Sequence, residues 1–384
     1  MQINEVKIFL ITLPFQDEFS HSMRKRSSVK NIIVEVIGGK GDLRGYGEGA
    51  PRSYVTGESQ ESTTRSIGKI LENDSFPRKL DNISQIWDFV DGLPKGKENN
   101  AAICAIEMAL LDLLGREKSQ SIIEYFPHDF LSDRVYYGVA LPLTDRKRIL
   151  EMAERIKDMG INKLKLKMGK HYDENRDIVE AIREVLGNIS DLKVDVNGAW
   201  DRELAFKHVS LIQDNQIRVV EQPMMPENQD VADFAMMMRD NGVKIMADES
   251  ACSFEDVENI VMNGHYDMIN VRLSKCGGFR RSFRIIHYLR EKGIPFQIAC
   301  QLGESGLLSA AGRILSLLCS DALYHDGSYD EFLLGENVTV ENVSFGHGGR
   351  AGPLGGGGLG VQMDRDKLKR LSNGSDGMTL WQAD

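Results

Sequence analysis

The chain has few cysteines, and their positions exclude two common ways of stabilising a small protein. They are odd in number and scattered, and no two stand in a C-x-x-C pair. A disulfide framework and a structural zinc site are therefore not expected. The five cysteines are Cys104, Cys252, Cys276, Cys300 and Cys319.

Long apolar runs and an excess of positive charge are also missing. The sequence contains no run of 18 apolar residues, so no transmembrane helix is expected. The apolar N-terminal segment contains Glu5 and Lys7, and its Val6, Ile8 and Leu10 recur with the period of a strand, unlike a signal peptide. The net charge of −10 argues against nucleic-acid and anionic membrane partners. We expect a soluble, cytoplasmic protein with reduced thiols.

The first third of the sequence has strand patterns followed by helix patterns. Strands are predicted over 3–13, 30–37 and 44–50, with a glycine-rich turn between the last two. Helices are predicted over 59–73, 82–91 and 99–118, the last with Asn99 or Asn100 as a possible N-cap. Strands followed by helices indicate an α+β unit.

From about residue 135 the pattern alternates between short apolar runs and amphipathic stretches. Eight such units of roughly 25–30 residues are typical of a TIM barrel, and their even spacing favours closure over an open doubly wound sheet. We therefore predict a (β/α)8 barrel over 131–340 with an α+β capping domain over 1–130, to which 341–384 return. The eight strand candidates are 135–139, 163–168, 192–196, 217–221, 243–247, 267–272, 295–299 and about 322–325.

The second strand candidate alternates lysine with apolar residues. Lys163, Lys165 and Lys167 share one face, and Leu164 and Leu166 the other. In a barrel the apolar face meets the helices, so the lysines point inward. Lys167 would lie nearest the C-terminal mouth, where barrel active sites are found.

Three acids end the next three strands. Asp195 closes LKVDVN, Glu221 closes RVVEQP and Asp248 closes KIMADES, and one βα unit separates each from the next. Three carboxylates in a low-dielectric site repel one another unless a cation is present. Oxygen ligands select a hard ion, so we expect Mg2+, with Mn2+ as the alternative.

This arrangement suggests proton abstraction next to a carboxylate. A metal can bind the substrate carboxylate and stabilise the enolate that forms when the neighbouring carbon loses its proton. A lysine near a divalent cation and a second lysine has its charged form disfavoured, so it can act as a base. Lys167 is that candidate, with Lys165 tuning it or binding the substrate carboxylate.

These residues resemble the enolase superfamily, specifically its muconate lactonizing enzyme (muconate cycloisomerase) subgroup. The resemblance covers nearly the whole chain and implies a Mg2+ site at Asp195, Glu221 and Asp248, with Lys167 as general acid/base. It also implies that cap segments 15–28 and 52–58 contribute to substrate selectivity. The matching motifs are Lys165-Leu-Lys167, Val194-Asp195-Val196-Asn197, Glu221-Gln222-Pro223, Met246-Ala247-Asp248-Glu249-Ser250 and Lys275-Cys-Gly-Gly278.

One position departs from the subgroup. Its members place a second catalytic lysine at the end of the sixth strand, where this chain has Arg272, with Lys275 three residues later. Arginine is effectively never deprotonated, so it can stabilise an enolate but is a poor base. We expect one-base chemistry, either cycloisomerisation or syn-elimination. The rival is a racemase or epimerase of N-acyl amino acids or dipeptides, with Lys275 or another group as second base.

Other residues are candidates for substrate contacts or support. The eighth strand ends in His325-Asp326-Gly327 instead of the Asp-x-Asp of dipeptide epimerases, which weakens the dipeptide interpretation. Arg24 and Arg26 in the cap hint at an anionic or polar substrate, although both can equally face solvent. Glu249 is expected to orient the metal ligands without binding the metal itself. The proposed substrate contacts are Asn197, Asn270, Glu304, His325 and Asp326.

Two other classes of function fit the sequence less well. A metal-dependent barrel hydrolase usually relies on histidine ligands, and none of the eight histidines ends strands two to six. A non-catalytic metal-binding barrel is disfavoured because buried lysines near a metal are costly unless they are used. The expected partner is a small-molecule carboxylate, and we expect a homo-oligomer.

Overall fold

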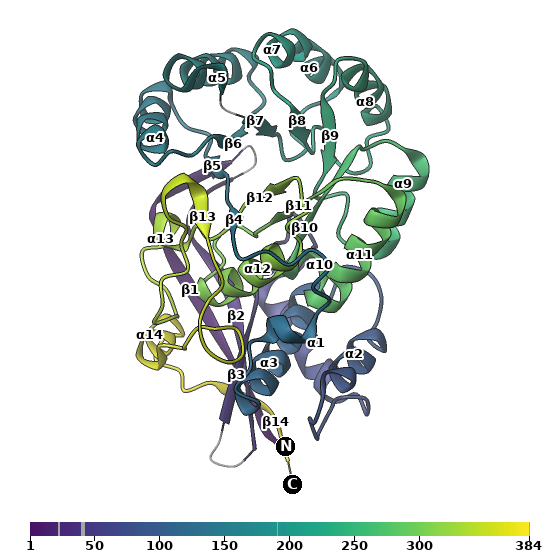
Figure 1. Cartoon of the computed structure of the whole chain (residues 1–384), viewed down its shortest axis with the longest axis vertical. Helices are drawn as coiled ribbons and strands as arrows, with labels where there is room; N and C mark the ends of the chain where they lie inside the picture. Colours follow the sequence, from purple (N-terminus) through teal and green to yellow (C-terminus); the bar gives the residue numbers. More distant parts are fainter. Residues whose placement is uncertain (22–23, 40–42, 190, 384) are drawn as a thin grey trace.

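The computed structural model describes the chain from residue 1 to 383 except for residues 22–23, 40–42 and 190; side chains are also left out for the rest of 17–26 and for Ile189. Figure 1 shows two parts, with a sheet and helices below and a ring of strands and helices above. Both termini lie at the far end of the lower part, where Ala383 N donates to Asn4 O at 2.8 Å.

The lower part is built on a four-stranded sheet in the order β14-β1-β2-β3. Its strands are β1 (Ile3–His21), β2 (Arg24–Gly38), β3 (Leu43–Gly49) and, from the other end of the chain, β14 (Met378–Gln382). The segment 15–28, expected to be a cap loop, is a long arm of the β1–β2 hairpin in the described backbone. Pairing resumes at Phe19↔Arg26 after a register shift that follows Pro14. The strand is therefore longer than the predicted 3–13, because the alternation of apolar residues stops at the shift.

Helices α1 (Gln60–Leu71) and α3 (Asn100–Glu117) lie on this sheet, α2 (Ile83–Asp91) packs against α3, and the short η1 (Ile122–Tyr125) follows α3. α3 is buried on nearly all sides, which explains its uniformly apolar sequence. It lies directly on β3, where a Cβ at Gly45, Gly47 or Gly49 would collide with its backbone. Asn99 is the N-cap residue, but its side chain makes no capping hydrogen bond.

The upper part is an eight-stranded parallel sheet in sequential order, with helices outside it. This confirms the predicted barrel with its N-terminal α+β cap. The strands are β5 (Val139–Leu141), β6 (Lys163–Lys167), β7 (Asp191–Asp195), β8 (Val219–Glu221), β9 (Lys244–Ala247), β10 (Met268–Arg272), β11 (Phe296–Ala299) and β12 (Tyr324–His325). The intervening helices are α4 (Arg146–Asp158), α5 (Tyr172–Leu186) with η2 (Gly187–Ile189), α6 (Arg202–Lys207), α7 (Val209–Asp214), α8 (Val231–Asp240), α9 (Phe254–Asn263), α10 (Leu273–Cys276), α11 (Gly278–Lys292) and α12 (Gly306–Leu318).

The first and last barrel strands differ from the expectation. The run at 135–139 splits, because β4 (Val135–Tyr136) pairs with β13 (Arg350–Ala351) and only the later β5 joins the barrel. β12 has two residues and is followed by a one-turn helix, α13 (Asp330–Leu333). The ring is joined between its ends by a parallel bridge from Gly138 to Asp326, with Gly138 N donating to His325 O at 2.8 Å.

The rest of the chain returns to the cap through η3 (His347–Gly349), β13 and α14 (Arg365–Leu371) before β14 joins β1. Cap and barrel are also bonded directly through α3. The carboxylate of Glu107 accepts hydrogen bonds from the backbone N–H groups of Phe279 and Arg280, in the first turn of α11. Among the described residues, no helix is long and apolar enough to cross a membrane.

Candidate active site

The strand register brings the predicted acids and the base to one end of the barrel. Lys167, Asp195 and Glu221 are neighbours across β6, β7 and β8. Asp248 lies two residues beyond Met246, which pairs with Glu221 across β8 and β9. All three carboxylates are fully buried. Because the strands are parallel, their carboxyl ends open at the same mouth.

Lys167 is bonded to the first of these acids. Its Nζ lies 2.6 Å from Asp195 Oδ2 and 2.8 Å from Asn197 Oδ1. Asn197 in turn donates from Nδ2 to Glu249 Oε1 at 3.0 Å. The Lys167 side chain keeps 13% of its surface exposed, so its amine reaches the space above the strands.

Arg272 and Lys275 hold the other two acids. Arg272 Nη2 donates to Asp248 and lies 3.3 Å from Glu221 Oε1. The Lys275 ammonium is fully buried and uses all its protons: it donates to Asp248 O at 2.9 Å, to Asp248 Oδ1 at 3.0 Å and to Asn270 O at 2.6 Å. Asn270 Nδ2 donates to Glu221 Oε1 at 2.6 Å, so this residue serves the carboxylate cluster.

A second charged layer lies next to the acids inside the barrel. Lys165 Nζ is 3.2 Å from Glu221 Oε2 and 3.1 Å from Asp326 Oδ2. Asp326 Oδ2 also accepts from Lys193 Nζ at 2.9 Å. Positive and negative side chains therefore alternate in this layer, and Lys165, Lys193 and Asp326 each have an opposite charge as neighbour.

The pKa directions follow from this arrangement. Burial first, and then the charge of Asp195, raises the pKa of Glu221 above its ordinary value. Burial opposes ionisation of Asp248, but Arg272 and Lys275 together hold its pKa below the ordinary value. Burial and the nearby carboxylates raise the pKa of Glu249 to about 8.

The donor set suits a hard divalent cation. Glu249 Oε2 is buried and accepts no hydrogen bond within the described part of the chain, and Glu221 Oε2 has only the ion pair with Lys165, so both oxygens can accept a further ligand. Three carboxylates without sulfur or nitrogen donors match the ligand preference of Mg2+. In the described side-chain arrangement, however, no three acidic, histidine or cysteine groups converge on one point. The acids are instead turned towards Lys165, Lys167, Arg272 and Lys275.

A cavity of about 650 Å3 opens above the strand ends. Its polar wall includes Lys165, Lys167, Asn197, Arg272, Gln301, Glu304 and Asp326, and much of the rest is apolar. The cap contributes Gln16 and Tyr54, one from each segment expected to influence selectivity. A mostly apolar cleft with a few convergent polar groups is typical of a small-molecule site.

Two of the expected substrate contacts lie in different surroundings. His325 is not among the described residues that line the cavity; it is buried, packs edge-on against Tyr137 and has its pKa lowered to about 4 by burial. Glu304 does line the cavity, and burial raises its pKa to about 8. The side chains of Arg24 and Arg26 lie outside the described residues.

Sequence reasoning missed three polar side chains at this site. Lys193 shares the inward parity of Asp195, and that parity is the signal that would have revealed it. Gln301 accepts from Arg272 Nη1 at 3.1 Å, and Gln222 accepts from the backbone N–H groups of Asp248 and Ser250. Both glutamines lie beyond strand ends, where parity no longer predicts direction.

The fold and site together define an α/β-barrel enzyme with a cap over its catalytic mouth. Residues 148–367 match the family described as enolase C-terminal domain-like, and residues 4–126 match the N-terminal domain of the mandelate racemase / muconate lactonizing enzyme family. The chain therefore belongs to the mandelate racemase / muconate lactonizing enzyme family of the enolase superfamily, as its motifs indicated.

Characterised relatives include isomerases of several kinds. The chain is 28% identical to a hydrophobic dipeptide epimerase of Enterococcus faecalis, over 81% of this chain and 86% of the relative. It is also 28% identical to an N-succinyl-L-Arg/Lys racemase of Bacillus cereus, over 81% of this chain and 83% of the relative. A chloromuconate cycloisomerase of a Pseudomonas species is 25% identical over 97% and 99%.

Solved structures of the first two relatives share the fold. The Bacillus cereus racemase superposes with a TM-score of 0.85 at 24% identity, covering 97% of this chain and 98% of that one. The Enterococcus faecalis epimerase, in complex with Mg and the dipeptide L-Leu-L-Tyr, superposes with a TM-score of 0.83 at 25% identity, covering 94% of this chain and 100% of that one. The chain is therefore an enzyme of the isomerase or lyase type within the enolase superfamily, and the structure of one relative contains Mg.

Proposed function

We propose that the enzyme removes the proton α to the carboxylate of a small-molecule substrate, with Lys167 as its single base. One observation carries this proposal: Lys167 and Arg272 both line the cavity beside the buried carboxylates, and only the lysine can give up its proton. The reaction class that follows is cycloisomerisation or syn-elimination through an enolate.

Asp195, Glu221 and Asp248 would hold Mg2+, or Mn2+ in its place. The chemistry that such an ion supplies is Lewis-acid binding of the substrate carboxylate and stabilisation of the enolate. The cations now bonded to these acids would have to release some of their oxygens. Of these cations, Lys275 is the one best placed to remain, because its ammonium also holds two backbone carbonyl groups.

The residues around the cavity then have separate roles in proton transfer and charge stabilisation. In its neutral form, Lys167 Nζ accepts the α proton and returns it to the product or leaving group. Asn197 orients that nitrogen from 2.8 Å. Arg272 is fixed to Glu221, Asp248 and Gln301, and its permanent charge stabilises the developing oxyanion without taking part in proton transfer. Lys165 adds a second buried positive charge beside the cluster.

Epimerisation of N-acyl amino acids or dipeptides is the second candidate, favoured by the activities of the two relatives at 28% identity. It requires a proton acceptor on each face of the substrate. Lys275 does not line the cavity within the described residues, and all its protons are bonded. Glu304 lines the cavity and has a pKa of about 8, so it is the better candidate for a second acceptor.

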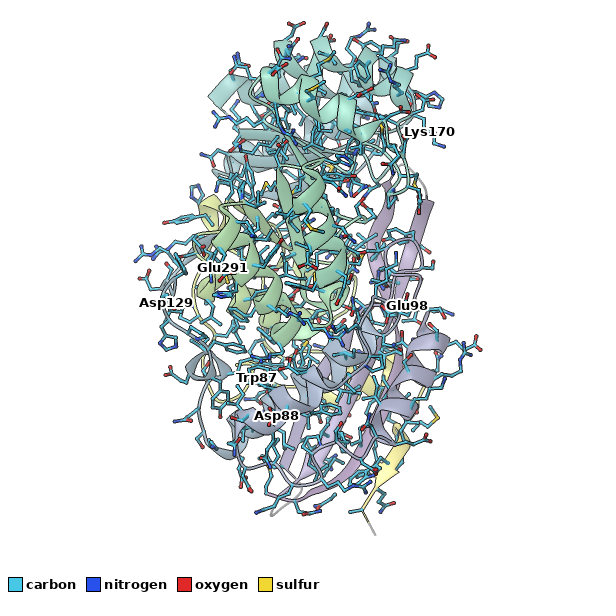
Figure 2. All side chains as sticks on the ribbon, turned by 90° about the vertical axis from the view of Figure 1, so that its right-hand side faces the viewer. Trp87, Asp88, Glu98, Asp129, Lys170 and Glu291 are labelled. Carbon is cyan, nitrogen blue, oxygen red and sulfur yellow. The ribbon has the colours of Figure 1, made fainter. Side chains whose placement is uncertain are left out.

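Isotope exchange separates the two reactions. The protein is incubated with Mg2+ in D2O and a panel of lactones, muconate-like diacids, N-acyl amino acids, dipeptides and hydroxy acids, and both product and α-deuterium are followed. The proposal expects ring closure or elimination without inversion, reduced about 10²- to 10⁴-fold in Lys167→Ala. The matched control is Lys170→Ala, an exposed lysine just beyond the same strand (Figure 2). Inversion of an α centre with deuterium uptake from both enantiomers would replace the one-base reaction with epimerisation.

A further inference from the structure

A second cavity, of about 590 Å3, lies on the outside of the molecule between barrel and cap. One wall is α11, and the other is formed by α2 and the segment 125–130; we call it the α11 groove. It shares no lining residue with the catalytic cavity. Figure 2 looks onto this face, with Trp87 of α2 on the cap side and Glu291, in the last turn of α11, on the barrel side.

The α11 wall is strongly basic in a chain whose net charge is −10. Positively charged or titratable side chains recur along the face of the helix that lines the groove: Arg280, Arg281, Arg284, His287 and Arg290. Most of these side chains are engaged by the protein itself. Arg280 forms a two-pronged ion pair with Asp91, Arg290 does the same with Asp321, and Arg281 donates to Asn100 and to Pro94 O.

Arg284 differs from its neighbours. Its guanidinium lies 4.1 Å from the ring centroid of Phe254, at the start of α9, and its side chain is exposed. No carboxylate within the described chain forms an ion pair with it. Stacking on an aromatic ring orients the guanidinium and leaves its N–H groups free for an anion.

The rest of the groove offers flat aromatic surface. Trp87 and Phe283 are half-buried and pack on the buried Phe126, with ring centroids 5.6 Å and 5.0 Å from it, so the outer faces of these two rings form the aromatic wall. Arg280 Cζ is 5.7 Å from the Trp87 ring. Aromatic faces with an arginine beside them bind a planar ring through stacking, while a fixed cation binds a negative group.

We propose that the α11 groove is a second ligand site, for a small planar aromatic anion, with Arg284 binding the carboxylate or phosphate and the aromatic wall binding the ring. Its volume is within the range of small-molecule sites. The site is independent of the catalytic reaction and does not depend on the proposed substrate.

Calorimetric titration with three related compounds tests both halves of this recognition. 1-Naphthoate has both the aromatic ring and the negative charge. 1-Naphthylmethanol has the aromatic ring without the charge, and cyclohexanecarboxylate has the charge without an aromatic ring. We expect saturable binding of 1-naphthoate, weaker by at least about tenfold for each of the other two. Arg284→Gln should weaken naphthoate binding by a similar factor. Arg176→Gln should not, although this half-exposed arginine also lies near an aromatic ring, 5.9 Å from Tyr172 on α5.

A Lys167→Ala protein distinguishes the groove from the catalytic cavity, which also accepts carboxylates under the proposed function. Naphthoate binding that survives Lys167→Ala and fails in Arg284→Gln supports the second site. Binding that is lost in Lys167→Ala and kept in Arg284→Gln assigns the probe to the catalytic cavity and overturns the proposal. Absence of saturable binding at millimolar naphthoate, including absence because an oligomer covers the groove, overturns it as well.

Discussion

Arg272, at the end of β10, and Asp248, just beyond the end of the neighbouring β9, are joined by a buried ion pair at the catalytic mouth. The same guanidinium nitrogen lies 3.3 Å from Glu221 Oε1, so one permanent cation is shared by two of the three predicted metal ligands. Burial opposes the charge of Arg272, yet the surrounding carboxylates raise its pKa well above the ordinary value. Arg272 therefore acts as a fixed positive charge, and any proton transfer at the mouth must use another group.

Replacing Arg272 by lysine should add a second proton acceptor where the wild type has a fixed charge. We expect Arg272→Lys to gain inversion of the α centre, at least about tenfold above any inversion by the wild type, because lysine can lose its proton near a divalent cation. Chiral chromatography of the substrate recovered from D2O measures it. Arg272→Met, which removes the charge without adding a base, should lower turnover about 10²- to 10³-fold. Inversion by the wild type at a rate equal to that of Arg272→Lys, and clearly above the uncatalysed rate, would contradict the one-base mechanism.

Lys275 should matter mainly for stability. Lys275→Met removes the donor to Asp248 and to two backbone carbonyl groups, all buried. Breaking a buried pair by removing one partner costs about 3–5 kcal/mol of unfolding free energy. Urea denaturation followed by circular dichroism measures the loss, and Lys170→Met serves as the exposed control. A variant of unchanged stability with normal circular dichroism would show that these contacts contribute little.

Mg2+ should stabilise the folded protein through the carboxylate cluster. A ligand that binds only the native state adds about 2.7 kcal/mol at one hundred times its Kd. We expect the melting temperature to rise with MgCl2 and to fall back on addition of a chelator. Asp195→Asn should abolish the rise, and Asp214→Asn, at an exposed position on α7, should preserve it. A rise that persists in Asp195→Asn would place the ion elsewhere.

The buried carboxyl of Glu304 should make stability depend on pH. Burial raises its pKa from 4.5 to about 8, so the folded state binds one more proton than the unfolded state between these values. Its contribution is therefore complete below about pH 4.5 and is lost as the pH rises towards 8, with a slope of at most about 1.4 kcal/mol per pH unit. Denaturant titrations at pH 5 to 9 should show a flatter profile for Glu304→Gln than for wild type or the exposed control Glu124→Gln. Parallel profiles would refute this assignment.

The sequence predicted the barrel and the position of its acids because both depend on regular strands. Lys167, Asp195 and Glu221 follow from alternation and from the even spacing of βα units, and the register places them side by side. Prediction failed where strands are short or irregular. β12 has only two residues, so its parity did not show that His325 faces Tyr137.

Long-range charge pairing was also beyond the sequence. The contact of Arg272 with Asp248 spans 24 positions, and that of Lys193 with Asp326 spans 133. Spacing can show that such groups point into the same barrel. Which cation bonds to which acid depends on side-chain lengths and on the depth of each residue along its strand, and these are fixed only in three dimensions.

The contact between Glu107 and the first turn of α11 limits how this enzyme can be divided or recombined. The barrel helix begins on an acid supplied by the cap, and Asn100 of the same cap helix donates to Cys252 O and Lys275 O. A gene fragment encoding the barrel alone would lose these partners and expose the surface that α3 now covers, so those main-chain groups would depend on water for their hydrogen bonds. A chimera of this barrel with another cap would need an acid and an amide at the same two places, so exchange of the cap is restricted by a few buried polar atoms, one of which holds the backbone of Lys275 behind the carboxylate cluster.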